Sequence, residues 1–292
     1  MKRDVIYNPE NLDRIRQVFA QGGIDQIHVL ADFDRTLTQA FVDDQEVPAV
    51  MYILHSGGYL SEDYTQKAQA LFEKYHPIEI DPQVPLAEKK RAMEEWWRVH
   101  FELLIRSGLS RDDLRKVLAS EKIRFRDGVL DFLDFLHEHG IPLVIMSSSG
   151  LGDKMISMCL EQAGRKYDNI HIVSNAFEWD ENGKAIRVKE PVIHVANKDE
   201  TVLSHFPFFE AIRDRRNVIL LGDNIEDVGM IEGFDYNNLL KIGFLNKDVD
   251  VNLPHYRNNF DVVITRDSSM EFVNDFLRNT FETREGKEGK VR

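Results

Sequence analysis

The chain has 292 residues, 42% hydrophobic and 30% charged, which is ordinary for a globular enzyme of one large or two modest domains. Its formal net charge of −13 argues against a nucleic-acid polymer or an anionic membrane as a partner, so an anionic small substrate would need local positive charge from a metal or a lysine. The single cysteine, Cys159, rules out an internal disulfide and favours a reducing compartment, so we expect a cytoplasmic protein.

The N-terminal stretch, residues 1–23, predicts an amphipathic helix and not a signal peptide. Charged residues interrupt any apolar segment of a signal sequence, whereas Leu12, Ile15, Val18 and Phe19 recur at helical spacing. The chain contains no run of about 18 apolar residues, the length needed to cross a bilayer. We therefore expect no membrane-spanning helix.

Short apolar runs, each followed by a loop and a helical pattern, recur through most of the chain. Fully apolar strands that alternate with helices are typical of a Rossmann-like α/β core, a parallel sheet covered on both faces. Such sheets bind ligands beyond the carboxyl ends of their strands, so chemistry is expected just after Phe33, Met146 and Leu221. The expected strands are 27–33, 141–146, 170–173, 218–221, 240–245 and 262–264, and the expected helices are 129–139, 154–163 and 200–213.

Residues 39–124 break this alternation and are called the cap below. The segment is charged and mostly helical in pattern, from 62 to 75 and again from 85 to 107. A long helical insertion after the first strand would stand over the strand ends, so residues 1–38 and 125–292 are expected to form the catalytic core. The dipeptide Asn182-Gly183, between the stretches 176–180 and 185–188, predicts a hairpin turn.

The first motif that indicates chemistry is the pair Asp32 and Asp34, followed by Thr36, at the end of an apolar strand. Carboxylates this close repel each other, and they are tolerated when a divalent cation or a shared proton relieves the repulsion. A strand-end turn with solvated aspartates is the alternative interpretation of this motif taken alone.

Two weaker signals follow along the chain. The run Ser147-Ser148-Ser149-Gly150 comes after an apolar strand, where hydroxyl and backbone N–H groups can hold a phosphate oxygen, although serine is also a common helix N-cap. Lys198 could offset phosphate charge, although most lysines are merely solvated.

The last motif, Gly222-Asp223-Asn224-Ile225-Glu226-Asp227, follows the strongest expected strand. Carboxylates at the carboxyl end of a strand suit a hard cation bound through oxygen. A capped loop explains three acids within five residues less well.

The order aspartate pair, serine, lysine and acidic cluster resembles the haloacid dehalogenase superfamily, whose signature is Asp-x-Asp-x-Thr, then Ser or Thr, then Lys, then Gly-Asp with a further Asp. A closer resemblance covers about residues 8–280 and is to the cytosolic pyrimidine 5′-nucleotidases, the type III cytosolic 5′-nucleotidase family. The matching stretches are EKYHPIEIDP (73–82), EW (95–96), IHVANK (193–198) and ILLGD (219–223).

The resemblance implies a magnesium-dependent phosphatase that hydrolyses nucleoside 5′-monophosphates, with CMP and UMP as the expected substrates. Asp32 would be the nucleophile that forms an aspartyl-phosphate, and Asp34 would be the general acid/base. Magnesium would be bound by Asp32, the carbonyl of Asp34, and Asp223. Thr36 and Asp227 would support this site.

The resemblance also implies that the core and the cap bind different parts of the substrate. Ser148, Ser149 and Lys198 would contact the phosphate, while Glu79 in the cap would read the nucleobase, with His100 near it.

Three positions depart from the family pattern. Arg35 stands where relatives often have an apolar residue, Ser147 where a bulkier one is expected, and His100 where a small polar one is expected. These departures leave the core chemistry intact but leave the base preference open.

Two other functions compete with this hypothesis. One is a phosphatase of the same type for another small phosphorylated metabolite, which Glu79, Trp96 and Trp97 would argue against if the tryptophans stack a base and do not only pack a helix. The other is a signalling domain phosphorylated on aspartate, which the two-apart aspartate pair and the long cap disfavour.

Overall fold

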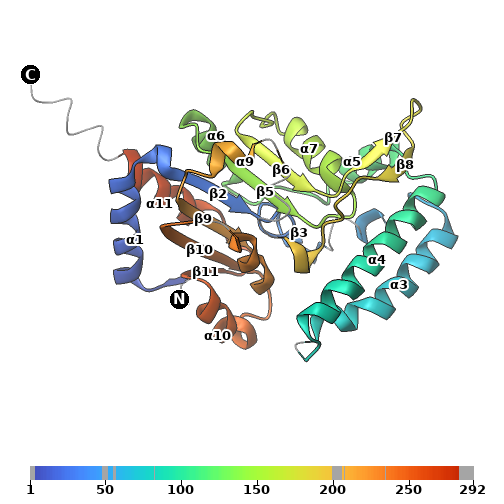
Figure 1. The fold of residues 1–292 in the computed structure, drawn as a ribbon, viewed down its shortest axis with the longest axis horizontal. Coiled ribbons are helices and arrows are strands. Elements are labelled where there is room, and N and C mark those ends of the chain that lie inside the picture. Colours follow the sequence, from blue (N-terminus) through green and yellow to red (C-terminus); the bar gives the residue numbers. More distant parts are fainter. Residues whose placement is uncertain are drawn as a thin grey trace, which may run out of the picture.

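The computed structural model describes residues 4–47, 52–54, 57–81, 83–198, 206, 208–233 and 235–282. The strands of its central sheet are Val5–Tyr7 (β1), Ile27–Ala31 (β2), Leu143–Ser147 (β5), Ile170–Ser174 (β6), Asn217–Gly222 (β9), Asn238–Leu245 (β10) and Val262–Thr265 (β11). They form one seven-stranded sheet in the order β1-β11-β10-β9-β2-β5-β6 (Figure 1). Every neighbouring pair is parallel except β1 with β11, so the predicted α/β class with a parallel sheet is confirmed.

Helices cover both faces of this sheet because the strand side chains are apolar in both directions. Successive residues of a strand face opposite sides, and in β2 Val29 and Ala31 belong to one buried apolar cluster while Leu30 belongs to the other. The first cluster is covered by Pro9–Gly22 (α1), Val129–Glu138 (α6), Gly152–Gln162 (α7) and Glu271–Phe281 (α11), and the second by Phe209–Ile212 (α9), Ile225–Ile231 (η3) and Val249–Asn259 (α10).

The strand order places the predicted motifs next to one another. The chain runs from β2 outward to β5 and β6, then returns to the other side of β2 for β9, β10 and β11. Such a reversal is a topological switch point, where open α/β sheets form a crevice beyond the strand ends. Here the backbone N–H of Asp32 donates to the carbonyl of Leu221 at 3.0 Å, so the ends of β2 and β9 are joined directly.

The cap begins with a short hairpin and continues as helices. Its elements are Phe41–Val42 (β3), Gln45–Glu46 (β4), Glu62–Ile80 (α3), Leu86–Arg106 (α4) and Arg111–Ala119 (α5). Helices α3 and α4 lie side by side, apart from the layers of the sheet (Figure 1). Helix α4 packs against β8 (Ala185–Val188) and η2 (Val195–Asn197) of the remaining chain. The domain boundaries at 38/39 and 124/125 stay a prediction.

Most expected elements occur close to their predicted positions. The N-terminal helix is confirmed as α1, which buries Ile15 and Phe19. The hairpin predicted at Asn182-Gly183 is formed by Phe177–Trp179 (β7) and β8, with Gly183 at a φ of 76° that favours glycine. Of the helix expected over 200–213, the structure shows α9, whereas residues 199–205 and 207 lie outside the described residues.

Helix α3 extends beyond the predicted 62–75. It continues through Pro77 to Ile80, although a proline inside a helix removes one backbone hydrogen bond. The amide of Asp81 donates to the Pro77 carbonyl at 3.2 Å, so the helical turn closes after the proline. The extension places Glu79 on the last turn of the helix and not in a loop.

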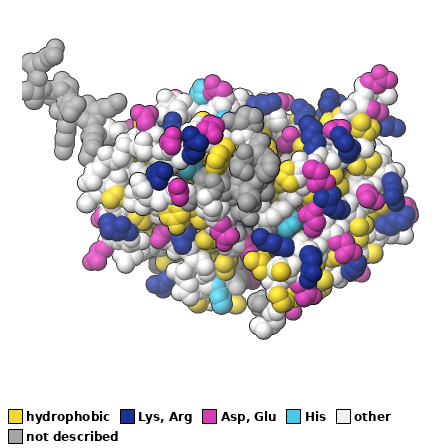
Figure 2. All heavy atoms as spheres, viewed as in Figure 1, with side chains coloured by type: hydrophobic (Ala, Val, Ile, Leu, Met, Phe, Trp, Pro, Cys, Tyr) yellow, Lys and Arg dark blue, Asp and Glu magenta, His cyan; other side chains and the backbone are white. Residues whose placement is uncertain are grey.

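The surface in Figure 2 is mixed in charge. Lysine and arginine side chains alternate with aspartate and glutamate side chains over the visible face, and neither sign forms one large patch. Within the described part of the chain, no helix combines the length and apolarity needed to cross a membrane.

Candidate active site

The ends of β2 and β9 hold a buried group of charges. Asp32, immediately after β2, is 6% exposed and accepts a hydrogen bond from the Lys198 ammonium at 2.6 Å. The same ammonium lies 3.2 Å from Oδ1 of Asp227, which is 2% exposed. Burying a lone charge is costly, but here one cation is shared by two carboxylates. Three residues distant in sequence are thus joined at the switch point.

Asp223 completes the acidic cluster, because one carboxylate oxygen from each of Asp32, Asp223 and Asp227 lies within 4.8 Å of the others. The turn after β9, which carries Asp223 and Asp227, is tight. The Asn224 amide donates to Oδ2 of Asp227 at 3.0 Å. A Cβ added to Gly222 would lie 2.5 Å from the Asp227 Cβ, so only glycine fits there.

The electrostatics of this cluster favour a cation. Burial raises the pKa of Asp32 to about 7, with the Asp227 carboxylate adding to the shift and the Lys198 ammonium opposing it. Burial also raises the pKa of Asp223 well above its usual range, and Asp32 and Asp227 add to it. Burial alone would lower the pKa of Lys198, but Asp227 and Asp32 raise it, so the lysine stays protonated. The three carboxylates form an all-oxygen donor set that suits a hard divalent cation.

The loop after Asp32 carries the other motif I residues. Asp34 is partly buried and lines the same cleft as Asp32. Thr36 is fully buried, and within the described part of the chain its hydroxyl has no hydrogen-bond partner. Its carbonyl accepts a hydrogen bond from Nε of Arg126 at 2.9 Å.

The serine run forms the turn between β5 and α7. Ser148 and Ser149 both line the cleft, and Ser149 is buried. The hydroxyl of Ser147 accepts from the Ser149 amide at 3.1 Å, and the hydroxyl of Ser149 accepts from the Leu151 amide at 3.4 Å. A small residue at position 147 therefore serves as a turn acceptor, which gives a structural reason for this departure from the family pattern.

Lys198 follows η2, and the segment before it is fixed by two asparagines that sequence reasoning missed. Asn175 accepts from the Ile193 amide at 2.8 Å and donates to the Ile193 carbonyl at 2.9 Å. Asn197 accepts from the His194 amide at 2.7 Å. Asparagines in loops are common, so the sequence carries no signal that singles these out.

The strand ends open into a cleft of about 1420 Å³ that is also lined by helices α3 and α4 of the cap. Glu79 and His76 lie on this cap wall, with Oε2 of Glu79 at 3.0 Å from Nδ1 of His76. The His76 ring stacks on Phe72, with ring centroids 4.5 Å apart. The predicted base-reading glutamate therefore faces the same cleft as the predicted nucleophile.

The remaining cap residues predicted from the sequence also line this cleft. His100 is buried, and its Nε2 lies 3.1 Å from the hydroxyl of Tyr64. Trp96 and Trp97 stack on each other with ring centroids 6.0 Å apart, and Trp97 also stacks on Phe101 of the apolar core. The tryptophans thus pack the cap while also bordering the cleft.

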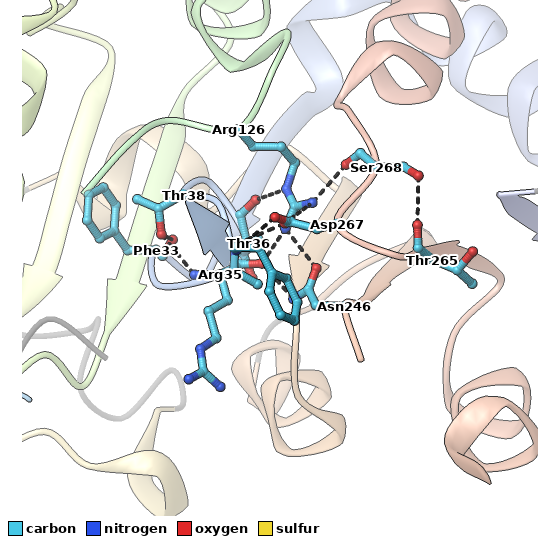
Figure 3. Close-up of polar contacts among 11 residues, drawn as sticks. Phe33, Arg35, Thr36, Thr38, Arg126, Asn246, Thr265, Asp267 and Ser268 are labelled. Atoms are coloured by element: carbon cyan, nitrogen blue, oxygen red, sulfur yellow. Dashed lines mark hydrogen bonds and ion pairs between the residues drawn. The ribbon is translucent and has the colours of Figure 1, made fainter. Parts of the chain in front are cut away.

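A second set of residues that the sequence did not predict surrounds the loop after Asp32. Arg126, Asn246 and Asp267 come from three separate segments (Figure 3). Arg126 and Asn246 bond backbone carbonyls of this loop, and Asp267 pairs with the Arg126 guanidinium. A lone arginine or aspartate in a loop carries no motif, so their convergence becomes visible only in three dimensions.

Comparisons with known proteins agree on one family. The model of the family Pyrimidine 5′-nucleotidase (UMPH-1) matches residues 35–281. The chain is 34% identical over 274 residues to the 7-methylguanosine phosphate-specific 5′-nucleotidase of Gallus gallus, which covers 94% of each chain. It is similar to the crystal structure of cytosolic 5′-nucleotidase IIIB bound to cytidine, with a TM-score of 0.86, 29% identity and coverage of 98% of this chain and 96% of that one.

A more distant likeness concerns the fold alone. The structure of a substrate-bound phosphoserine phosphatase matches with a TM-score of 0.51 and 17% identity, covering 86% of this chain and 97% of that one.

Proposed function

The chain belongs to the pyrimidine 5′-nucleotidase family, and from this premise we propose that it hydrolyses nucleoside 5′-monophosphates through an aspartyl-phosphate on Asp32. The family and the enzyme class predicted from the sequence, a 5′-nucleotidase of the haloacid dehalogenase type, are confirmed by the matches to the family and its relatives. The choice of substrate and the role of each residue are the proposal.

The observation that carries the proposal is the buried contact between Asp32 and Lys198 at the switch point. Asp32 attacks phosphorus, the ester oxygen leaves with the nucleoside, and a phosphoryl group remains on the Asp32 carboxylate. Lys198 holds the carboxylate in place and offsets the negative charge of the phosphoryl oxygens. Ser148 and Ser149 line the cleft beside it and would contact the same oxygens.

We propose magnesium as the cofactor because the acidic cluster fits it. Asp32, Asp223 and the backbone carbonyl of Asp34 would hold the ion. Asp227 supports the ligands, since its two oxygens already contact Lys198 and the Asn224 amide. When bound, the ion would neutralise charge on the phosphoryl group that is transferred.

Asp34 is the proposed general acid/base. It lies two residues after the nucleophile and lines the cleft with its side chain partly buried. It protonates the leaving 5′-oxygen in the first step, and then takes a proton from the water that attacks the aspartyl-phosphate. The products are a nucleoside and inorganic phosphate.

The cap wall supports a nucleobase as the leaving-group feature that is recognised. Glu79 can accept hydrogen bonds from an exocyclic amine or a ring N–H, and aromatic rings border the cleft beside it. Cytosine offers the amine and uracil the ring N–H, so CMP and UMP remain the substrates predicted from the sequence. The cytidine bound to the similar 5′-nucleotidase IIIB supports this choice.

A second candidate substrate is 7-methylguanosine 5′-monophosphate. Relatives are named for this substrate, and the same cap wall suits it physically. Its methylated base carries a positive charge, which aromatic faces and a carboxylate both attract. Guanine also offers an amine and a ring N–H to Glu79.

We further propose that the enzyme acts in the cytoplasm on a small-molecule nucleotide and on no nucleic-acid polymer. The support is the lone buried cysteine, the net charge of −13 and the cytosolic relative among the solved structures.

The decisive experiment measures phosphate release from CMP, UMP, 7-methyl-GMP, GMP, AMP and 4-nitrophenyl phosphate, by the wild type and by Asp32→Asn. We expect turnover of one or both candidate classes by the wild type and none by the variant. Comparing GMP with 7-methyl-GMP isolates the effect of N7 methylation, which gives the base its positive charge. Release from a non-nucleotide phosphate alone would support the alternative metabolite phosphatase, and no release at all would contradict the proposal.

A further inference from the structure

The loop that follows β2, residues 33–38, carries Asp34 and is called the Asp34 loop below. Its backbone turns tightly, since the Leu37 amide donates to the Phe33 carbonyl at 3.0 Å. Arg35 has a φ of 61°, in the left-handed region that non-glycine residues seldom adopt. Such a conformation persists where the surroundings impose it, so the contacts that hold this loop decide where Asp34 points.

Those contacts come from Arg126, whose side chain is 1% exposed. A guanidinium has five N–H donors in a planar fork and accepts no hydrogen bond, so burying it requires several acceptors in matching directions. The structure supplies four hydrogen bonds and one ion pair (Figure 3). The acceptors are Thr36 O (2.9 Å), Ser268 O (2.7 Å), Arg35 O, Asn246 Oδ1 (3.0 Å) and Asp267 Oδ1 (2.9 Å).

Two of these partners contact the chain near the loop themselves, and with Arg126 they are called the Arg126 cluster: Arg126, Asn246 and Asp267. Asn246 donates from Nδ2 to the Arg35 carbonyl at 3.0 Å, so this carbonyl accepts two hydrogen bonds. Asp267 accepts from the amides of Ala40 and Phe41 at 3.0 and 2.9 Å. The cluster therefore holds the Asp34 loop and the first residues of the cap together.

The return connection from the cap passes through the same place. The Gln39 amide donates to the Arg124 carbonyl and the Arg126 amide to the Leu37 carbonyl, each at 2.9 Å. One buried guanidinium thus contacts the Asp34 loop and lies on the connection by which the chain leaves the cap.

We infer that Arg126 is a positioning residue, which fixes Asp34 for proton transfer and ties its loop to both connections of the cap. This inference rests on the proposed function, in which Asp34 protonates the leaving oxygen. Arg126 itself touches no reacting atom. Without the guanidinium, the Thr36 carbonyl loses its side-chain donor and the Arg35 carbonyl keeps only the one from Asn246. The loop then relaxes, so Asp34 no longer meets the leaving oxygen at hydrogen-bond distance.

Leaving-group chemistry separates this role from simple support of the fold. A nucleoside 5′-oxygen is a poor leaving group and needs a proton as it departs, whereas 4-nitrophenolate departs readily without one. The value of kcat/KM reports the steps up to the departure of the leaving group. Misplacing the acid should therefore lower kcat/KM for a nucleotide far more than for 4-nitrophenyl phosphate, while partial unfolding lowers both equally.

The experiment compares Arg126→Lys with the wild type, at saturating Mg²⁺, on 4-nitrophenyl phosphate and on the nucleotide that the wild type hydrolyses best. Lysine keeps the charge but not the fork. We expect kcat/KM for the nucleotide to fall about 10- to 100-fold, mostly through kcat, and that for 4-nitrophenyl phosphate to fall less than about threefold. In an Asp34→Asn background, Arg126→Lys should add little, because the group it positions is gone.

Arg124→Lys is the matched control. Arg124 lies on the same connection and pairs with the exposed Asp43 at 3.0 Å. Among the residues that the structure describes, its guanidinium bonds Asp43 and the Glu121 carbonyl and not the Asp34 loop, so both substrates should react at wild-type rates. If Arg126→Lys does not fold, Asn246→Ala provides the test, since it removes one donor to the Arg35 carbonyl; a smaller loss of about three- to tenfold on the nucleotide alone is then expected.

Equal losses on the two substrates, or a full additional loss in the Asp34→Asn background, would overturn the inference and leave the proposed function intact. No phosphate release by the wild type from any substrate would overturn the proposed function, and the inference with it.

Discussion

The strand-end floor of the cleft and its cap wall hold their polar groups in different ways. On the floor, Asp32 and Lys198 are each 6% exposed, and they are joined to each other and to Asp227 across long sequence separations. On the cap wall, Glu79 and His76 are about a third exposed and pair with each other within one helix. Buried groups that are joined by ion pairs and hydrogen bonds keep their geometry, whereas exposed neighbouring groups exchange partners readily.

This difference matches the two tasks of the proposed enzyme. Phosphoryl transfer needs the nucleophile and its counter-charges at fixed positions before the substrate arrives. Recognition of a base needs polar groups that can exchange a bound water or a weak partner for a hydrogen bond to the base. Glu79 could do this by breaking its contact with His76. Changes to the nucleophile or to its counter-charges on the floor should therefore affect every phosphate ester, and changes on the cap wall only those substrates that reach it.

The largest effect is expected for Asp32→Asn. A carboxamide cannot form the aspartyl-phosphate, so kcat should fall by about a thousandfold or more on nucleotides and on 4-nitrophenyl phosphate alike. Steady-state assays with matched circular dichroism spectra measure it. The control is Asp13→Asn, which removes an exposed carboxylate paired with Arg16 on α1 and should change neither rate. Wild-type turnover by Asp32→Asn would contradict the proposed nucleophile.

The second effect concerns the metal. EDTA should stop turnover and Mg²⁺ restore it, because oxygen donors suit a hard cation. Mutating a residue that only hydrogen-bonds a metal ligand typically lowers metal affinity about 10- to 100-fold. Asp223 is a proposed ligand itself, so Asp223→Ala should raise the Mg²⁺ concentration for half-maximal rate by about a hundredfold or more, and the substrate KM much less. Full activity of the dialysed, metal-free enzyme would exclude this role.

The same cluster should show its repulsion in stability. Without metal, the three carboxylates disfavour the folded state, so Asp223→Asn should raise the melting temperature by about 2 °C for each kcal/mol of repulsion removed. Adding Mg²⁺ should stabilise the wild type strongly and the variant weakly. A thermal-shift titration measures both. A variant that melts below the metal-free wild type would mean that Asp223 makes a net stabilising contact.

The floor was predictable from the sequence because its residues follow apolar strands. Short apolar runs such as 218–221, alternating with helical patterns, indicate inner strands of a parallel sheet. Parallel strands present their carboxyl ends together, so Asp32, Ser148 and Asp223 were expected at the same edge, and all three line the cleft. The placement of Lys198 depended on the family resemblance, because its segment is irregular and shows no periodic pattern.

Other features depend on tertiary contacts that no local pattern encodes. The Arg126 cluster joins residues 120 and 141 positions apart, and each is ordinary in its own segment. Helix α3 continues through Pro77, against the usual effect of proline, so the turn that carries Glu79 was not predicted as helix. Trp96 and Trp97 both pack the cap and line the cleft. Their positions in the sequence therefore could not distinguish helix packing from stacking on a base.

The third effect tests the cap wall. Removing a hydrogen bond to a charged group costs about 1.5–3 kcal/mol, so Glu79→Ala should lower kcat/KM for the preferred nucleotide about 10- to 100-fold and leave 4-nitrophenyl phosphate nearly unchanged. Glu73→Ala, on the exposed side of the same helix, is the matched control and should change neither. An equal loss on both substrates would show that Glu79 supports the floor or the fold, and the base assignment would be dropped.

The smallest effect is expected where the cap contacts the segment that leads to Lys198. Arg98 of α4 donates from Nη1 and Nη2 to the Glu190 carboxylate at 2.6 and 3.0 Å, and Glu190 precedes the segment that carries Lys198. Both side chains are about half exposed, at 46% and 60%. An exposed ion pair contributes about 0.2–1 kcal/mol, so Arg98→Met should lower kcat/KM for the nucleotide by less than about fivefold.

The dependence on ionic strength and a control at a neighbouring arginine make this last test more specific. The loss in Arg98→Met should shrink as ionic strength rises, because salt already weakens the wild-type pair. Arg106→Met is the matched control, since Arg106 pairs with Glu102 within α4 and not with the segment that leads to Lys198. A loss beyond about tenfold, or about 1.4 kcal/mol, would mean that this contact does more than an exposed pair can. It would then hold the cap and the Lys198 segment in register, and selectivity and chemistry would be coupled through Arg98 as well as through the Arg126 cluster.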